Sequence, residues 1–195
     1  MGESQIRTMA ANMAHEAGLD GALLFAVIKT ESGWNPRAFR HEPAFYTRYI
    51  ADNPDLNALW GGAPRRISSS YGLGQLMYTT ALENGFSRNR PPEDLYDPKT
   101  NLELTIRLLT RLLRKYGGNV KDAVAAYNSG RPFDKAPRFT RETHVPKVLR
   151  AMGGTATTLA KKATTALPSW TWLALAGISG LLIVALAARG GQQGV

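Results

Sequence analysis

Glu31 is the residue whose type and sequence environment best suit acid–base catalysis. It follows the apolar run Leu23-Leu24-Phe25-Ala26-Val27-Ile28. Leu23, Val27 and Glu31 are four residues apart, so a helix would place the carboxyl group in line with an apolar stripe. Apolar surroundings and the negative end of the helix dipole both favour the protonated carboxyl group, which can act as a general acid. From this stretch alone, a glutamate that turns into solvent is the alternative.

Two further stretches combine polar groups with glycine. Gly72-Leu73-Gly74-Gln75 has glycines that permit close backbone approach and unusual dihedral angles. Ala126-Tyr127-Asn128-Ser129-Gly130 places an aromatic and an amide side chain where a helix should end. The three histidines lack the spacing of a zinc motif, cysteine is absent, and no glycine-rich segment precedes a Lys-Ser or Lys-Thr pair. We therefore expect no metal, nucleotide or other cofactor.

The elements that position these residues are predicted to be helices. Asp20 is a candidate N-cap for the helix that carries Glu31, and Gly33 and Pro36 limit its end. Thr100 and Glu103 match a capping box. Helices are expected at residues 4–17, 75–84, 101–116, 119–130 and 145–152, with short helices and loops at 38–67 along one side of a groove. No strand is expected, so the fold class is mainly α.

The charge and the C-terminal segment suggest a second part of the chain. The net charge is +9, and residues 101–195 hold 14 basic and 4 acidic residues. This basic half could face an anionic cell wall, anionic lipid or nucleic acid, or it could be a solvated surface. We expect a domain at 1–152, a flexible linker at 153–166 and a short tail at 189–195. The uncharged residues 167–188 would form a helix of about 33 Å, enough for a transmembrane span, with a buried helix as the alternative.

The three motifs, in this order, resemble those of the lytic transglycosylases of the soluble type (SLT) in the lysozyme-like superfamily. The resemblance covers about residues 10–150 and includes Trp34-Asn35-Pro36 and Pro146-Lys147-Val148-Leu149. It implies a lysozyme-like helical domain that cleaves peptidoglycan between N-acetylmuramic acid and N-acetylglucosamine. A 1,6-anhydromuramic end would form, because the C6 hydroxyl attacks in place of water. No second carboxylate is then required, unlike the usual pair of a glycosidase.

The resemblance also implies residue roles. Glu31 would be the single catalytic acid/base, and Ser32 would position substrate or backbone beside it. Gln75, with the backbone of Gly72, Leu73 and Gly74, would hold sugar acetamide groups. Tyr127 and Asn128 would orient Glu31 and the sugar, with hydrogen bonds from Tyr127 that keep the carboxyl group in its rotamer.

The chain departs from the family pattern at three places. The family often has Met at the position of Gly74 and Tyr at the position of His144. The insertion at 40–67 carries Glu42, Asp52 and Asp55, any of which could be a second carboxylate. Glu42 is the first candidate, although it could instead be the structural partner of a nearby arginine.

The expected location follows from charge and hydropathy. Residues 1–14 contain no apolar run, so no secretory signal is expected. Lys161 and Lys162 precede the expected span and only Arg189 follows it. Charge counting would then leave the enzyme domain in the cytoplasm, away from its substrate. We expect a single-pass, membrane-anchored enzyme of a bacteriophage virion, acting in the periplasm during entry, and a bacterial envelope enzyme inserted tail-first is the alternative.

The expected partners are peptidoglycan glycan strands, a lipid bilayer through residues 167–188 and other virion membrane proteins, with no specific nucleic acid. Three rival functions remain from the sequence alone. They are a hydrolase of the goose-type lysozyme kind, a non-catalytic structural protein of a viral membrane, and a DNA-binding protein.

Overall fold

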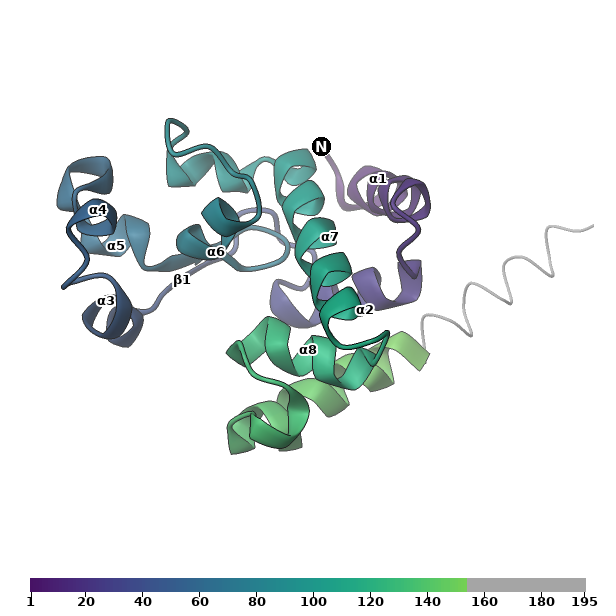
Figure 1. Ribbon diagram of the computed structural model, residues 1–195. Coiled ribbons are helices and arrows are strands. Elements are labelled where there is room, and N and C mark those ends of the chain that lie inside the picture. Colours follow the sequence, from purple (N-terminus) through teal and green to yellow (C-terminus); the bar gives the residue numbers. More distant parts are fainter. Residues whose placement is uncertain (154–195) are drawn as a thin grey trace, which may run out of the picture. The chain divides into compact units, whose positions relative to one another are not determined.

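The computed structural model describes residues 1–153, and this part of the chain is mainly helical, as predicted (Figure 1). The helices of more than one turn are α1 (Glu3–Glu16), α2 (Gly21–Glu31), α3 (Pro43–Tyr49), α6 (Tyr78–Glu83), α7 (Pro98–Lys115) and α8 (Val120–Ser129), followed by a C-terminal helix at residues 138–153. The shorter elements are α4 (Pro54–Asn57), α5 (Pro64–Ile67) and the helical turns Leu59–Gly62, Pro92–Tyr96, Phe133–Lys135 and Thr140–His144. Helix α7 is the longest of them, with 18 residues.

The predicted linker, membrane span and tail lie outside the described residues, apart from residue 153. Within residues 1–153, no helix is both long and apolar enough to cross a membrane.

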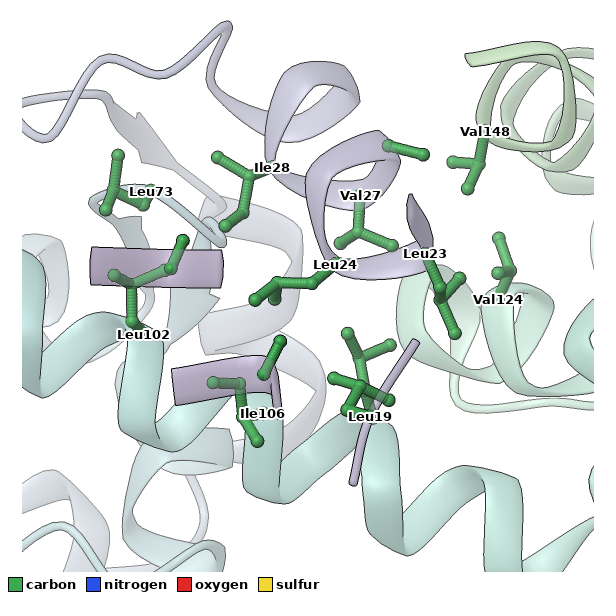
Figure 2. Packing of buried hydrophobic residues seen from close by; sticks show 14 of the residues in the cluster. Leu19, Leu23, Leu24, Val27, Ile28, Leu73, Leu102, Ile106, Val124 and Val148 are labelled. Atoms are coloured by element: carbon green, nitrogen blue, oxygen red, sulfur yellow. The ribbon is translucent and has the colours of Figure 1, made fainter. Parts of the chain in front are cut away.

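Helix α2 lies in the middle of one hydrophobic core. Asp20 caps it as predicted, because its carboxylate accepts a hydrogen bond of 2.8 Å from the Ala22 N–H. Six of its eleven residues are buried. Figure 2 shows the apolar side chains of α2 among those of α7, α8 and the C-terminal helix. A helix covered on so many sides holds its last residue, Glu31, in a fixed place.

Helix α7 separates two hydrophobic clusters. Leu102, Ile106 and Leu109 pack with α1 and α2. Leu104, Leu108 and Leu112, which lie on another face of the helix, pack with residues from the segment 50–95. Two apolar stripes on one helix therefore join two lobes, which Figure 1 shows on either side of α7.

A small antiparallel sheet corrects the prediction that the chain has no strand. Strand β2 (Ser69–Tyr71) pairs with β1 (Phe39–His41) on one side and β3 (Leu76–Met77) on the other. Strands of two or three residues are too short to show an alternating pattern in the sequence. The predicted helix at 75–84 is also wrong at its start, because residues 76–77 pair with β2 and helix α6 begins at Tyr78.

The helix caps were predicted with mixed success. Asn119 caps α8 as expected, accepting a hydrogen bond of 3.2 Å from the Asp122 N–H. The capping box at Thr100 is wrong, since α7 begins at Pro98 and its cap is Asp97, which accepts a hydrogen bond of 2.9 Å from the Thr100 N–H. Proline at the first helical position loses no hydrogen bond and favours this earlier start. The C-terminal helix also begins early, at residue 138, and residues 140–144 form a π-helical turn within it.

Candidate active site

A pocket of about 590 Å³ lies where residues of both lobes meet. This volume is within the range of small-ligand sites. Glu31 lines it at the end of α2, beside residues of three other parts of the fold. These are Arg40, Glu42, Phe45 and Tyr49 near α3; Ser70, Gln75, Leu76, Met77, Thr80 and Glu83 near the sheet and α6; and Leu108, Arg111, Leu112, Lys115, Ala126, Tyr127, Asn128, Ser129 and Gly130 from α7 and α8.

Glu31 is held by its neighbours rather than turned into solvent. Its side chain is 12% exposed, and its Oε1 lies 2.8 Å from Nε2 of His144, which is 7% exposed. After Glu31 the backbone turns sharply, with positive φ angles of 62° at Gly33 and 70° at Trp34. The Trp34 ring is buried and meets Phe25 edge-on at 4.9 Å. Trp34 thus anchors the turn that ends α2.

The turn at residues 72–75 is shaped by close packing. Gly72 has a φ of 68°, and a Cβ there would lie 2.5 Å from the Asn101 amide nitrogen. Gly74 has an ordinary φ, but a Cβ there would collide with Thr105 Oγ1 and lie 2.8 Å from the Tyr127 hydroxyl. No side chain fits at Gly74 in this arrangement, so the departure from the family's methionine matches the local packing. Gln75 itself takes a φ of 47° and donates from Nε2 to the Gly72 carbonyl at 3.1 Å.

Asn101 ties this turn to helix α7. Its amide nitrogen donates to the carbonyls of Tyr71 and Leu95 at 2.9 and 2.8 Å, and its Oδ1 accepts from the Gly74 N–H at 2.8 Å. The side chain is fully buried. One side chain thus makes hydrogen bonds to three backbone groups from three parts of the fold.

Tyr127 supports the same turn. Its hydroxyl donates to the Gly74 carbonyl at 2.6 Å. Burial raises the pKa of this phenol far above its ordinary value, and the nearby charge of Glu31 raises it further. Tyr127 therefore stays neutral. Because a phenol has one O–H, the predicted hydrogen bond from Tyr127 to Glu31 is wrong, and His144 makes that contact instead.

The remaining residues of the predicted site are only partly gathered in the pocket. Asn128 lines it and accepts a hydrogen bond of 2.7 Å from the Thr140 hydroxyl. Ser32 donates to the Ile28 carbonyl at 3.2 Å and lies outside the pocket lining. The Leu73 side chain is buried in the core beside α2, which leaves only its backbone for the predicted contact with sugar.

Of the three carboxylates in the 40–67 insertion, Glu42 alone lines the pocket. Its Oε1 lies 2.5 Å from Arg40 Nε, so it has the arginine partner that the sequence suggested. Asp52 and Asp55 are exposed. Among residues 1–153, no three His, Asp or Glu side chains are placed to hold a metal ion.

Residues 8–143 match the family model described as Transglycosylase SLT domain. The chain belongs to this family. Its members are peptidoglycan lytic transglycosylases, and the protein is an enzyme of that kind. The match spans Glu31, the turn at 72–75 and the Tyr127-Asn128 pair. The mainly helical structure is consistent with the lysozyme-like fold of SLT domains.

Sequence reasoning missed several residues that organise this SLT site. His144 was noted only as a departure from the family pattern, yet it contacts Glu31 across 113 positions of sequence. Asn101 and Thr105 were unmarked members of a helix. Their one signal in the sequence was their spacing. Asn101 and Thr105 are four residues apart, so they share a face of a leucine-rich helix, which suggests a buried polar contact.

Proposed function

We propose that the protein cleaves the β-1,4 bond between N-acetylmuramic acid and N-acetylglucosamine in peptidoglycan and leaves 1,6-anhydromuramic ends. Glu31 is the single acid/base in this proposal. The observation that supports this role is the environment of Glu31. Its side chain lines the pocket, is 12% exposed and is hydrogen-bonded to an imidazole. A carboxyl group in this position can give and take a proton at the same place in the cleft.

In this reaction the same carboxyl group acts twice, first as an acid and then as a base. Glu31 first gives its proton to the glycosidic oxygen, the bond from that oxygen to muramic C1 breaks, and N-acetylglucosamine leaves with a C4 hydroxyl. The Glu31 carboxylate then takes the proton from the muramic C6 hydroxyl while that oxygen bonds to C1. The anhydro ring closes, Glu31 is protonated again, and no water is consumed.

Two amide side chains in the pocket suit a sugar that carries acetamide groups. Gln75 and Asn128 line the pocket with amides that can pair with acetamide groups. Tyr127 acts through the turn, since its hydroxyl fixes the Gly74 carbonyl. The rings of Phe45 and Tyr49 lie 4.8 Å apart on the insertion side of the pocket, where an aromatic surface can cover a sugar face.

The test compares full-length wild-type protein with Glu31→Gln and with Glu16→Gln, an exposed glutamate on α1. Each digests purified peptidoglycan, and mass spectrometry identifies the ends. We expect anhydro ends from the wild type and from Glu16→Gln, and a loss of about 100-fold or more in rate for Glu31→Gln. Reducing ends would mean that water attacks, as in a goose-type lysozyme, and Glu42 would be the next residue to change. Equal cleavage by Glu31→Gln would refute its role.

We also propose that residues 167–188 anchor the enzyme in a membrane and that a bacteriophage virion carries it to the wall, where it acts in the periplasm during entry. Support comes from the sequence: this segment contains no charged residue and begins near Trp170 and Trp172. Other virion membrane proteins are then candidate neighbours. Immunoblots of purified particles and host envelopes test the location. Detection in envelopes but not in particles would refute a virion role and favour a bacterial envelope enzyme.

A further inference from the structure

The contact between Glu31 and His144 joins a partly buried and a buried side chain that lie far apart in the sequence. Nε2 of His144 lies 2.8 Å from Oε1 of Glu31, with 7% and 12% of the side chains exposed. Among the hydrogen bonds of residues 1–153, this is the one made to the Glu31 carboxyl group. The contact therefore sets where that group points.

The other ring nitrogen identifies the form of the imidazole. Nδ1 of His144 is buried and has no hydrogen-bond partner in the described part of the chain. A proton on Nδ1 would be a buried donor without an acceptor, which proteins avoid more strictly than an unused acceptor. The imidazolium and the Nδ1–H tautomer both carry that proton. The neutral ring with its proton on Nε2 is the form that leaves no buried donor unpaired, and in that form His144 donates to Oε1 of Glu31.

The local backbone brings His144 to this position. Residues 140–144 form a π-helical turn, a feature that often marks functional sites. Thr140 and His144, at its two ends, are buried, while the three residues between them are exposed. Thr140 donates to Asn128 and His144 contacts Glu31. One turn thus supports two residues of the predicted site.

We propose that His144 is a positioning residue that fixes Oε1 of Glu31 by donation from Nε2, so that Oε2 is the oxygen that gives and takes the proton. This inference rests on the proposed function of Glu31. A neutral donor holds the carboxyl group in one rotamer whether it is protonated or ionised, because Oε1 accepts in both states. That property suits a group that must act first as acid and then as base from one position.

Kinetics test the role with two substitutions and a control. His144→Gln keeps a neutral side-chain N–H donor, and His144→Leu removes it. Thr143→Ala changes an exposed residue of the same turn. On soluble glycan strands we expect His144→Leu to lose about 10- to 100-fold in kcat, as for a misplaced catalytic group, with little change in KM. His144→Gln should recover most of that loss, and Thr143→Ala should match the wild type. Wild-type kcat in a folded His144→Leu protein would overturn the proposal, as would equal loss in the Gln and Leu variants.

A second measurement is independent of turnover. Full-length protein labelled with 15N-histidine gives ring signals for His15, His41 and His144, and the signal missing in His144→Gln identifies that ring. We expect the two-nitrogen pattern of a neutral Nε2–H imidazole near neutral pH, altered by Glu31→Gln but not by Glu16→Gln. An imidazolium or Nδ1–H pattern, or no response to Glu31→Gln, would overturn the proposal. Because this readout needs no cleavage, it decides the contact even if Glu31→Gln retains activity and the proposed function fails.

Discussion

Asn101 offers the sharpest test of how the site is supported. Its amide makes three hydrogen bonds, of 2.9, 2.8 and 2.8 Å, to the backbone groups of Tyr71, Leu95 and Gly74. The side chain is fully buried, so water does not replace it freely in an Asn101→Ala variant. Each lost bond removes about 1 kcal/mol, and leaving a buried backbone group unpaired adds to that cost. We therefore expect the free energy of unfolding to fall by about 3–5 kcal/mol.

Urea denaturation of the full-length protein measures this loss. Asn84→Ala is the matched control, because the Asn84 amide makes a single bond of 2.7 Å to the Thr80 carbonyl in a partly buried turn. That variant should lose about 1 kcal/mol. Equal losses in the two variants would refute the reasoning, since the turn at 72–75 would then be held by other contacts. The rate of peptidoglycan cleavage by Asn101→Ala should fall as well. Gln75 is the residue after Gly74, and it loses its fixed position when the Gly74 N–H is no longer bonded to Asn101.

Three further predictions concern single contacts. Gly74→Ala should destabilise the protein by about 1–3 kcal/mol through overpacking, whereas Gly21→Ala, with open space around its Cβ position, should be neutral or stabilising in the same urea titrations. Tyr127→Phe should lose about 0.5–1.5 kcal/mol of stability with its bond to the turn, and calorimetry would contradict this if the melting temperature stayed unchanged. The Arg66 hydrogen bonds lower the pKa of Glu93, so this exposed pair stabilises the fold above the usual carboxyl pKa and loses that effect as pH falls through the lowered value. Arg66→Ala should therefore lower the free energy of unfolding by less than about 1 kcal/mol near pH 7. The two proteins should differ less in this free energy when the pH is lowered to about 2, where Glu93 becomes protonated.

The local sequence was enough to predict the scaffold that carries Glu31. The sequence has an apolar run at helical spacing, with an aspartate before it and a glycine after it. This combination predicts a helix from local sequence alone, because capping and periodicity act over a few residues. Helix α2 accordingly begins after Asp20 and ends at Glu31. The N-cap of α8 at Asn119 was predictable for the same reason. The ordered motifs at residues 31–33, 72–75 and 126–130 were likewise sufficient to identify the transglycosylase family.

Only the tertiary structure decided what these residues contact. The strands at 69–71 and 76–77 form because the turn between them is fixed by Asn101 and Tyr127, which lie on other helices. The partner of Glu31 was assigned to Tyr127 from the family pattern, yet that hydroxyl has one proton and donates it to Gly74. His144 reaches Glu31 from a π-helical turn at residues 140–144 that packs against α8. Hydrogen bonds between side chains 113 residues apart depend on how whole helices pack, and no local pattern in the sequence records that packing.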